Sequence, residues 1–183
     1  MKPIDRFLRA WRTRVALRVA PAAMQAVLDV GCGDSYLLSR VRTGQRTGID
    51  PDITQTHIEA GIRLAPGRFP DDLAALAPDD RYDAIFALAV FEHLTDADFA
   101  QARDRLPDML QKHGRLIVTV PHPLVDAILD LLMRLRLIDG QAVHEHHGFE
   151  PVRLLELRSD RLRMVYRRRF QFGLNNLFVF EKI

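Results

Sequence analysis

Two glycines that follow a short apolar run are the first residues whose types and spacing could do chemistry. The run occupies residues 26–30 (AVLDV), and Gly31, Cys32 and Gly33 come directly after it. Glycine lets a backbone turn tightly and come close to a ligand, as it does where a strand passes into a helix in nucleotide-binding folds. The pattern predicts a nucleotide-binding loop, although a Gly-x-Gly pair alone also fits a structural turn.

The residues around this loop indicate which kind of nucleotide it fits. A dinucleotide loop has a third glycine three residues after the second, where this chain has Tyr36. Asp29 and Asp34 would place carboxylates beside a phosphate, and that repulsion lowers affinity. Asp50, seventeen residues after Gly33, can accept hydrogen bonds from both hydroxyls of a ribose. These features favour S-adenosylmethionine, which has a ribose, a positive amino group and a sulfonium, and no phosphate.

Histidines near the ends of the expected strands are the candidate catalytic bases. Methyl transfer to an oxygen requires removal of a proton, and histidine is the usual base near neutral pH. The catalytic residues that we assign are His93, His122 and His147, the last from the cluster 144–147 (HEHH). Structural alternatives stay open, because the Glu92-His93 pair can cap or bind a neighbouring loop and His122, between two prolines, can belong to a turn.

The same histidine cluster raises the question of a metal ion. Imidazole and carboxylate are metal ligands, but adjacent residues of an extended segment point in alternating directions, so at most two residues of 144–147 could contact one ion. Cys32 is the single cysteine, which excludes an intramolecular disulfide and a cysteine-based zinc site. We expect no metal and favour a substrate-facing loop, with a metal site as the alternative.

Short apolar segments alternate with helical ones along most of the chain. We predict strands at 26–30, 46–50, 82–87 and 115–120, a weak strand ending at Phe69, and helices at 35–41, 54–64 and 96–111. Such alternation is typical of a parallel sheet covered on both faces. The segments 162–172 and 176–181 predict a closing antiparallel hairpin. The predicted fold is therefore a doubly wound α/β fold, with a mostly parallel Rossmann-like sheet and a C-terminal antiparallel hairpin.

Two predicted helices lie outside this alternation. Residues 4–19 place apolar side chains one turn apart and arginines over the remaining surface, which predicts a basic amphipathic helix. Residues 124–138 are apolar around much of their circumference and need a cover or a ligand. We predict one domain, 1–183, in which 1–22 form an N-terminal cap and 124–147 form a helical insertion over the substrate site.

Composition limits the class of protein. The 183 residues are 48% hydrophobic and 27% charged, which fits one globular domain and excludes disordered and coiled-coil classes. Charged residues interrupt any apolar run near the N-terminus, and no stretch of 18 consecutive apolar residues occurs. We therefore expect no export signal and no membrane-spanning helix, and we expect a cytoplasmic protein. Residues 1–46 carry nine Lys and Arg against three acids, and such an end is either a solvated surface or a site for an anionic partner.

Four segments together resemble the class I S-adenosylmethionine-dependent methyltransferases, in particular the small-molecule branch that includes ubiquinone-biosynthesis-type enzymes. They are VLDVGCGDSYLL (27–38), TGIDPD (47–52), RYDAIFALAVFEHL (81–94) and LQKHGRLIVTVPHP (110–123), in the family's order and spacing. The resemblance implies S-adenosylmethionine as cofactor, and it implies cofactor-binding roles for Asp29, Gly31, Cys32, Gly33, Asp50, Pro51, Asp71, Asp72, Ala87 and Leu88.

By this resemblance each part of the cofactor has its own residues. Asp29 and the two glycines of the loop would hold the methionine part, and Asp50 the ribose. The adenine contact falls at Asp71 or Asp72, and Ala87 with Leu88 would line the methionine end.

The chain departs from the family pattern at three positions. Ser35 replaces the glycine that often closes the first loop, and we expect it at a helix N-cap. Gly114 stands alone where the family often has Pro-Gly-Gly. Ala89 offers no oxygen where some quinone-pathway relatives use an acid for a cation, which weakens a metal role for the Glu-His pair.

The expected function is S-adenosylmethionine-dependent methyl transfer to a small-molecule or lipid-linked acceptor, at oxygen because of the nearby histidines. A nucleic-acid partner is disfavoured, since the basic termini are its main support, and the basic first helix allows peripheral contact with a membrane. Two alternatives stay open. One is an RNA methyltransferase, and the other is a cofactor-binding accessory protein without turnover.

Overall fold

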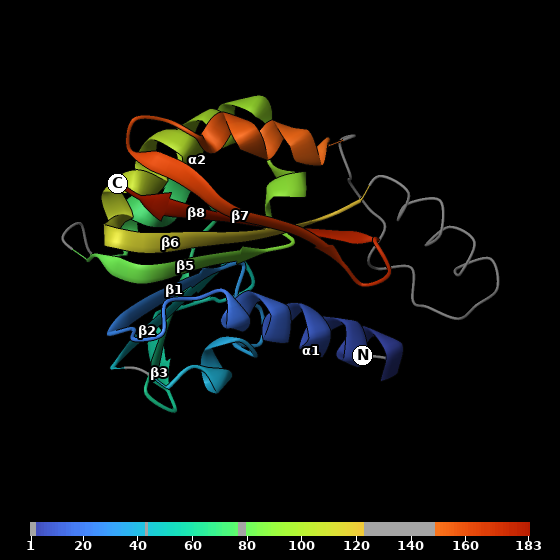
Figure 1. The fold of residues 1–183 in the computed structure, drawn as a ribbon. Helices are drawn as coiled ribbons and strands as arrows, with labels where there is room; N and C mark the ends of the chain where they lie inside the picture. Colours follow the sequence, from blue (N-terminus) through green and yellow to red (C-terminus); the bar gives the residue numbers. More distant parts are fainter. Residues whose placement is uncertain (1–2, 43, 77–79, 123–148) are drawn as a thin grey trace.

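The computed structural model describes residues 3–42, 44–76, 80–122 and 149–183 (Figure 1). The predicted helix 124–138, the predicted insertion 124–147 and His147 lie outside these residues. Among the described residues, no helix is both long enough and apolar enough to cross a membrane.

The described strands form one eight-stranded sheet in the order β3-β4-β2-β1-β5-β6-β8-β7. Their bounds are β1 (Ala26–Val30), β2 (Gln45–Asp50), β3 (His57–Glu59), β4 (Ile62–Pro66), β5 (Tyr82–Leu88), β6 (Leu110–Pro121), β7 (Leu162–Phe170) and β8 (Asn175–Lys182). Strands β4, β2, β1, β5 and β6 pair in parallel, whereas β8 pairs antiparallel with both β6 and β7. The predicted parallel sheet with a C-terminal hairpin is confirmed.

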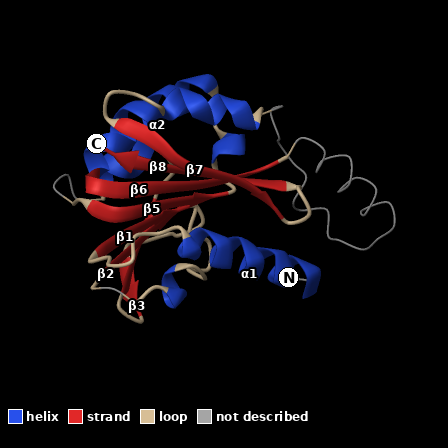
Figure 2. Ribbon diagram, viewed as in Figure 1, coloured by secondary structure: helices blue, strands red, loops and turns tan. Residues whose placement is uncertain are grey.

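The two faces of the sheet carry separate hydrophobic cores. Helix α1 (Pro3–Arg18) packs on one face, and α2 (Asp96–Met109) with the 3₁₀ helix η5 (Pro151–Leu157) packs on the other (Figure 2). Alternate residues of β5 serve the two cores, since Phe86 belongs to the α1 side and Ile85 to the α2 side. Burial on both faces explains why the central strands are continuously apolar.

The order of the strands fixes the place of a ligand site. The chain passes from β1 to β2 and β4 on one side and returns to β5 on the other side of β1. Ligands in open α/β sheets bind outside the carboxyl ends of the strands at such a reversal point. The loops after β1, β2 and β5 therefore meet at the carboxyl ends of the strands.

Helix α2 has a well-defined start and end. The Thr95 side chain accepts a hydrogen bond from the backbone N–H of Asp98, and the Asp98 carboxylate accepts one from the N–H of Thr95, each at 3.2 Å. This capping box satisfies donors at the helix start. Pro107 lies in the last turn, and the chain enters β6 at Leu110. The helix predicted at 96–111 is confirmed apart from its last two residues, which belong to β6.

The helix predicted at 35–41 is wrong. The segment contains a single 3₁₀ turn, η1 (Leu38–Arg40), after a series of turns. Ser35 has a φ of 56°, in the left-handed region, so it cannot act as the N-cap that we expected, because an N-cap residue has extended backbone angles. The residues that would have formed the first turn of the helix belong instead to the turns of the glycine loop.

The helix predicted at 54–64 is also wrong. This segment forms the antiparallel pair of β3 with the first part of β4, joined at Ala60 and Gly61, whose φ values of 50° and 74° are typical of a tight hairpin turn. The third parallel strand is therefore β4, which ends at Pro66, and Phe69 lies beyond it in the core. Ile62 and Leu64 are buried in this strand. Packing in the core therefore determines the conformation of this segment, although the spacing of its apolar residues favours a helix.

At the turn of the C-terminal hairpin, the first strand ends two residues earlier than predicted and the second strand begins one residue earlier. β7 ends at Phe170, and the turn begins with Gln171 and Phe172, whose φ values of 50° and 58° are left-handed. At the other end of the sheet, β6 starts five residues before the predicted position, with His113 at a φ of 63°. Gly114 is required there, because a Cβ atom would lie 2.9 Å from the carbonyl oxygens of Gln111 and Tyr82.

Candidate cofactor site and acceptor cavity

The loop after β1 is held in place because its backbone N–H groups donate hydrogen bonds to residues at the end of β2. The N–H of Gly31 donates to the carbonyl oxygen of Ile49 at 2.8 Å, and the N–H of Gly33 donates to Oδ2 of Asp50 at 2.8 Å. Oδ1 of Asp50 accepts from the N–H of Asp52 at 3.0 Å. A carboxylate has about four acceptor positions. Asp50 can therefore shape the loop and still accept hydrogen bonds from ribose hydroxyls.

The two glycines of the loop serve different purposes. Gly31 has a φ of 69°, and a Cβ atom there would lie 2.7 Å from Cγ2 of Val90. Gly33 has a φ of 50°, and no atom lies within 4 Å of the position that its Cβ would occupy. Gly31 is thus required for packing against the loop after β5, whereas the open side of Gly33 leaves room for a ligand to approach the backbone.

Asp29 is a buried acid at the end of β1. Its side chain is only 4% exposed, and its pKa is raised to about 8, chiefly by burial and further by the charge of Asp50. Burial disfavours the charged form of a carboxyl group unless a cation compensates it. The positive amino group of S-adenosylmethionine has the charge that this pair of acids needs, so the site fits that cofactor.

Cys32 is part of the packing under the loop. Its thiol is buried, and its pKa is raised to about 12, chiefly by burial and then by Asp29 and Asp50. A Cβ atom on Gly48 would lie 2.6 Å from the sulfur. The Cys32 N–H donates to the carbonyl oxygen of Ile49. Cys32 therefore packs the glycine loop against β2.

The loop after β5 contains a residue that the sequence analysis did not assign to the site. Ala87 is completely buried inside β5, whereas Leu88 is partly exposed at its end. Ala89 follows with a φ of 63°, and its N–H donates to the carbonyl oxygen of Thr119 at 2.9 Å. Left-handed backbone at a residue with a side chain is often found at functional sites. No sequence signal marks such a conformation at an alanine.

The adenine candidates lie beyond β4. Asp72 is engaged, because Oδ2 accepts a hydrogen bond from the backbone N–H of Arg68 at 2.7 Å. Asp71 is exposed at the start of the 3₁₀ helix η2 (Asp71–Ala75). Pro51 lies exposed in the turn directly after β2. Asp71 is thus the candidate whose carboxylate is more available for an adenine.

The structure describes two of the three catalytic candidates. His93 is exposed in the 3₁₀ helix η3 (Phe91–His93), directly after the buried Glu92. His122 follows β6, is partly buried, and donates its backbone N–H to the carbonyl oxygen of Leu174 at 2.9 Å. His147 lies outside the described residues. Within the described part of the chain, no group of three or more His, Cys, Asp or Glu residues could hold a metal ion.

Helix α1 contacts the glycine loop and the hairpin turn. Arg9 forms an ion pair with Asp34 and stacks on the Tyr36 ring with its guanidinium carbon 4.1 Å from the centroid. At the hairpin turn, the side-chain amide of Gln171 donates to the carbonyl oxygen of Leu8 at 2.6 Å. The N-terminal half of α1 thus spans the carboxyl ends of the strands.

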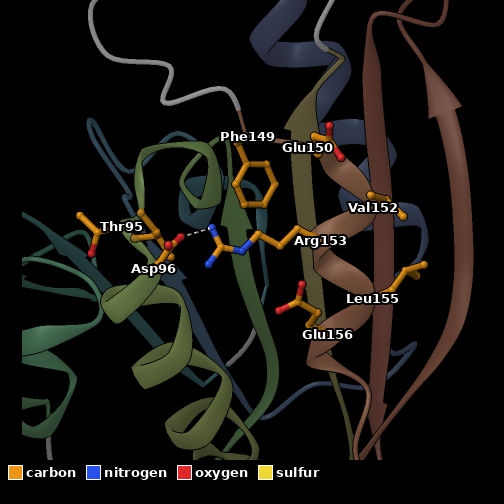
Figure 3. Close-up of a pocket in the computed structure, with 9 residues that line it drawn as sticks. Thr95, Asp96, Phe149, Glu150, Val152, Arg153, Leu155 and Glu156 are labelled. Atoms are coloured by element: carbon orange, nitrogen blue, oxygen red, sulfur yellow. Dashed lines mark ion pairs between the residues drawn. The ribbon is translucent and has the colours of Figure 1, made fainter.

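A cavity of about 700 Å³ lies between the start of α2 and η5 (Figure 3). Nη1 of Arg153 pairs with Oδ1 of Asp96 at 2.7 Å across it, and the Arg153 guanidinium carbon lies 4.5 Å from the centroid of the Phe99 ring. Figure 3 shows the Phe149 ring beside this ion pair. Leu94, Thr95, Asp96, Phe149, Glu150, Val152, Arg153, Leu155 and Glu156 line the cavity.

Known structures share this fold. A protein of Pyrococcus horikoshii superimposes with a TM-score of 0.72 at 14% identity, covering 98% of this chain and 92% of that one. The N-methyltransferase NodS of Bradyrhizobium japonicum, crystallised with S-adenosyl-L-homocysteine, has a TM-score of 0.63 at 18% identity and covers 99% and 88% of the two chains. A Burkholderia thailandensis 1,6-didemethyltoxoflavin-N1-methyltransferase has a TM-score of 0.61 at 17% identity, with 93% and 78% covered.

Curated relatives match part of the chain. The tRNA U34 carboxymethyltransferase of Shewanella denitrificans is 34% identical over 122 residues, which cover 59% of this chain and 36% of that protein. The same enzyme of Shewanella pealeana is 36% identical over 97 residues, with 45% and 29% covered. The chain spans about a third of the length of the curated relatives it matches.

A family model settles the class of the protein. The model of a methyltransferase domain matches residues 3–168, which contain the glycine loop, Asp50 and the parallel sheet. The chain therefore belongs to the methyltransferase domain family.

Proposed function

We propose that this methyltransferase transfers a methyl group to an oxygen atom of a small-molecule or lipid-linked acceptor. The observation that carries the proposal is the cavity between α2 and η5, whose volume of about 700 Å³ lies within the usual range of small-molecule sites. Its lining combines apolar and aromatic side chains with a few charged groups, as such sites usually do.

The cavity and the cofactor loops belong to connected parts of the chain. Leu94 and Thr95 of the cavity come directly after η3, which itself follows β5 and Ala89. On the opposite wall, Arg153 is held by Asp96 and by the face of Phe99. The ion pair and the contact with the aromatic ring both favour this position of the Arg153 guanidinium, from which it can donate hydrogen bonds to an acceptor's oxygen atoms.

The proposed mechanism assigns the chain a positioning role and one proton transfer. S-adenosylmethionine supplies the activated methyl group when it is bound. Asp50 binds the ribose hydroxyls, and Asp29 binds the amino group. Neither His93 nor His122 lines the cavity, but His93 directly precedes Leu94 of its lining. In this mechanism His93 or His122 removes the proton from the acceptor hydroxyl through an imidazole nitrogen, which makes the oxygen a better nucleophile. Alignment of the two reactants supplies most of the rate enhancement.

RNA is the second candidate acceptor, and two specific observations favour it. The curated relatives carry the name of tRNA-modifying enzymes, although they match only part of this chain. Exposed arginines also follow one another along the edge strand β7, at Arg167, Arg168 and Arg169, and arginines bind phosphate groups.

Methyl incorporation from labelled S-adenosylmethionine tests the proposal. The protein is incubated with a panel of phenols, sugars, hydroxy acids and their lipid-linked forms, and separately with unmodified tRNA. We expect label in a small hydroxylated acceptor and none in tRNA. Label in tRNA alone would replace the small-molecule proposal with the RNA one, and cofactor binding without transfer to either class would support an accessory role.

Cavity variants identify the acceptor site. Arg153→Ala and Phe149→Ala should raise the KM for the labelled acceptor and leave the affinity for S-adenosyl-L-homocysteine unchanged. Arg103→Ala is the matched control, because Arg103 is an arginine of α2 that pairs with the exposed Asp104 and does not line the cavity. An unchanged KM in both cavity variants would place the acceptor elsewhere.

A further inference from the structure

Phe172 is the most exposed large apolar side chain among the described residues. It lies in the turn between β7 and β8 and is 86% exposed. Its φ of 58° is left-handed, a backbone conformation that is unfavourable for a bulky side chain and that glycine and asparagine adopt most easily. Neither the exposure nor the backbone of this position therefore favours a phenylalanine in the chain by itself, and we looked for a contact outside the chain that would.

Phe172 belongs to an exposed apolar patch that it shares with the start of α1. The Trp11 ring packs edge to face on Phe172, with centroids 5.4 Å apart, and the Phe7 ring packs on Trp11 at 5.7 Å. Phe7 is 58% exposed, and Ile4, three residues earlier on the same face of the helix, is 43% exposed. Figure 1 shows the hairpin turn and the start of α1 at the same end of the molecule. The apolar patch thus consists of Ile4, Phe7 and Phe172.

The apolar patch lies at the carboxyl ends of the parallel strands. Gln171, which precedes Phe172, donates a hydrogen bond from its side-chain amide to the carbonyl oxygen of Leu8 in α1 at 2.6 Å. Arg9 of the same helix pairs with Asp34 of the glycine loop. These two contacts hold the start of α1, the hairpin turn and the glycine loop together. A surface that covers the apolar patch would therefore face the same end of the sheet as the glycine loop.

The two segments that carry the apolar patch are both basic. Helix α1 contains five arginines and a single acid, Asp5. Arg6 is exposed directly beside Phe7 in this helix, and Arg168 and Arg169 are exposed at the end of β7, just before the hairpin turn. Apolar side chains surrounded by arginines are complementary to a surface that is negatively charged outside and apolar beneath. The surface of a bilayer with anionic lipids has this chemistry.

We propose that the apolar patch docks this protein on the surface of a bilayer that contains anionic lipids. Ile4, Phe7 and Phe172 enter the region between the headgroups and the acyl chains, and the arginines stay at the level of the lipid phosphates. A protein partner would have to cover about 800 Å² of this chain, more apolar area than three partly exposed side chains supply. Docking would turn the carboxyl ends of the strands toward the membrane, whatever the acceptor is.

Co-sedimentation with lipid vesicles tests the proposal on the full chain. Vesicles of phosphatidylcholine alone are compared with vesicles that also contain phosphatidylglycerol. Wild-type protein should partition onto the anionic vesicles about tenfold or more strongly, since each arginine near an anionic surface contributes about fivefold. The partitioning should weaken at 1 M NaCl, because the Debye length falls to about 3 Å.

Matched variants assign the binding to the apolar patch. Phe172→Asn should lower partitioning onto anionic vesicles about tenfold, because an apolar side chain is lost. It should leave the melting temperature nearly unchanged, because asparagine tolerates the left-handed backbone. Phe7→Ser is the second variant, should Phe172→Asn not fold. Arg6→Glu should weaken binding to the anionic vesicles only. Ile58→Ser is the control, because Ile58 is 75% exposed but lies in β3, at the other side of the sheet.

Three outcomes would overturn the proposal. The first is a wild-type protein that does not sediment with anionic vesicles. The second is a folded Phe172→Asn protein that binds them as strongly as wild type, or an equal loss in the Ile58→Ser control. The third is self-association of wild-type protein that Phe172→Asn abolishes, without vesicle binding, which would assign the apolar patch to a second copy of the chain. Because no acceptor enters these measurements, a failure of the proposed acceptor class would leave the result unaffected.

Discussion

Asp29 should make cofactor binding depend on pH. Its pKa of about 8 in the free protein means that it is mostly protonated below that value, whereas the amino group of the cofactor favours the ionised form. Binding should therefore release a proton, and affinity should rise with pH by up to about tenfold per unit before it levels off near pH 8. Calorimetry in two buffers of different ionisation enthalpy counts the protons, and Asp29→Asn should release none from this site.

The same carboxyl should affect the stability of the cofactor-free protein in the opposite direction. An aspartate in an unfolded chain has a pKa of about 3.9, so between pH 4 and 8 the folded protein holds a proton that the unfolded chain has lost. This contribution to the free energy of unfolding is complete below about pH 4 and falls as pH rises toward 8.

The binding measurement can contradict this account of Asp29. A cofactor affinity that stays constant from pH 6 to 8 would mean that Asp29 is not neutral in the cofactor-free protein.

His122 is the described histidine whose replacement should cost the most turnover. Its backbone is fixed to the hairpin turn by the hydrogen bond to Leu174, which holds it beside the end of β6. If it is the base, His122→Ala should lower kcat by about 10²- to 10⁴-fold and leave the affinity for S-adenosyl-L-homocysteine unchanged. His93→Ala is measured beside it. Near wild-type turnover in both variants would leave positioning as the main source of catalysis.

Some features of the site were predictable from single residues, and others were not. The spacing of Asp50 from Gly33 identified an acid at the end of β2, and the structure places it there. Its hydrogen bond to the Gly33 N–H depends on how β1 and β2 pair, which residue types do not determine. The left-handed Ala89 and the interaction of Arg12 with Glu92 likewise arise from tertiary packing.

At the scale of elements, the capping box of α2 should contribute measurably to stability. Thr95→Ala removes the oxygen that accepts from the Asp98 N–H and should lower the free energy of unfolding by about 1 kcal/mol. Urea denaturation measures the change. Asp98→Ala is the companion variant, since it removes the reciprocal acceptor of the Thr95 N–H. An unchanged midpoint in Thr95→Ala would mean that water replaces the cap without cost.

The predictions of secondary structure were wrong where backbone conformation and strand pairing differ from what the spacing of apolar residues indicates. The central strands were readable because they are buried on both faces, and α2 because Thr95 and the following acids mark its start. The helices predicted at 35–41 and 54–64 were not formed, because left-handed residues such as Ser35 and Ala60 interrupt them. Apolar residues of β4 then pair with β2, a contact that periodicity alone could not reveal.

At the scale of the whole molecule, the cofactor site gathers elements that are distant in sequence. The glycine loop, the ends of β2 and β5, the hairpin turn and α1 meet at one edge of the sheet (Figure 1). The fold class was predictable because the central strands β1 and β5 are mostly apolar and buried on both faces. The docking of α1 across this edge was not, since it depends on contacts such as Gln171 with Leu8, which are 163 residues apart.

Because these elements form one site only in the folded chain, cofactor binding should stabilise the entire molecule. S-adenosyl-L-homocysteine at a hundredfold excess over its Kd should raise the free energy of unfolding by about 2.7 kcal/mol, since the unfolded chain has no site. For a chain of this size the melting temperature should rise by roughly 5–11 °C. Thermal unfolding with increasing ligand measures the shift, and Asp50→Ala, which removes the ribose contact, should shift the response to higher ligand concentration. A melting temperature that does not move at ligand concentrations saturating in calorimetry would mean that the ligand binds unfolded chains equally well, and hence that the assembled loops do not form its site.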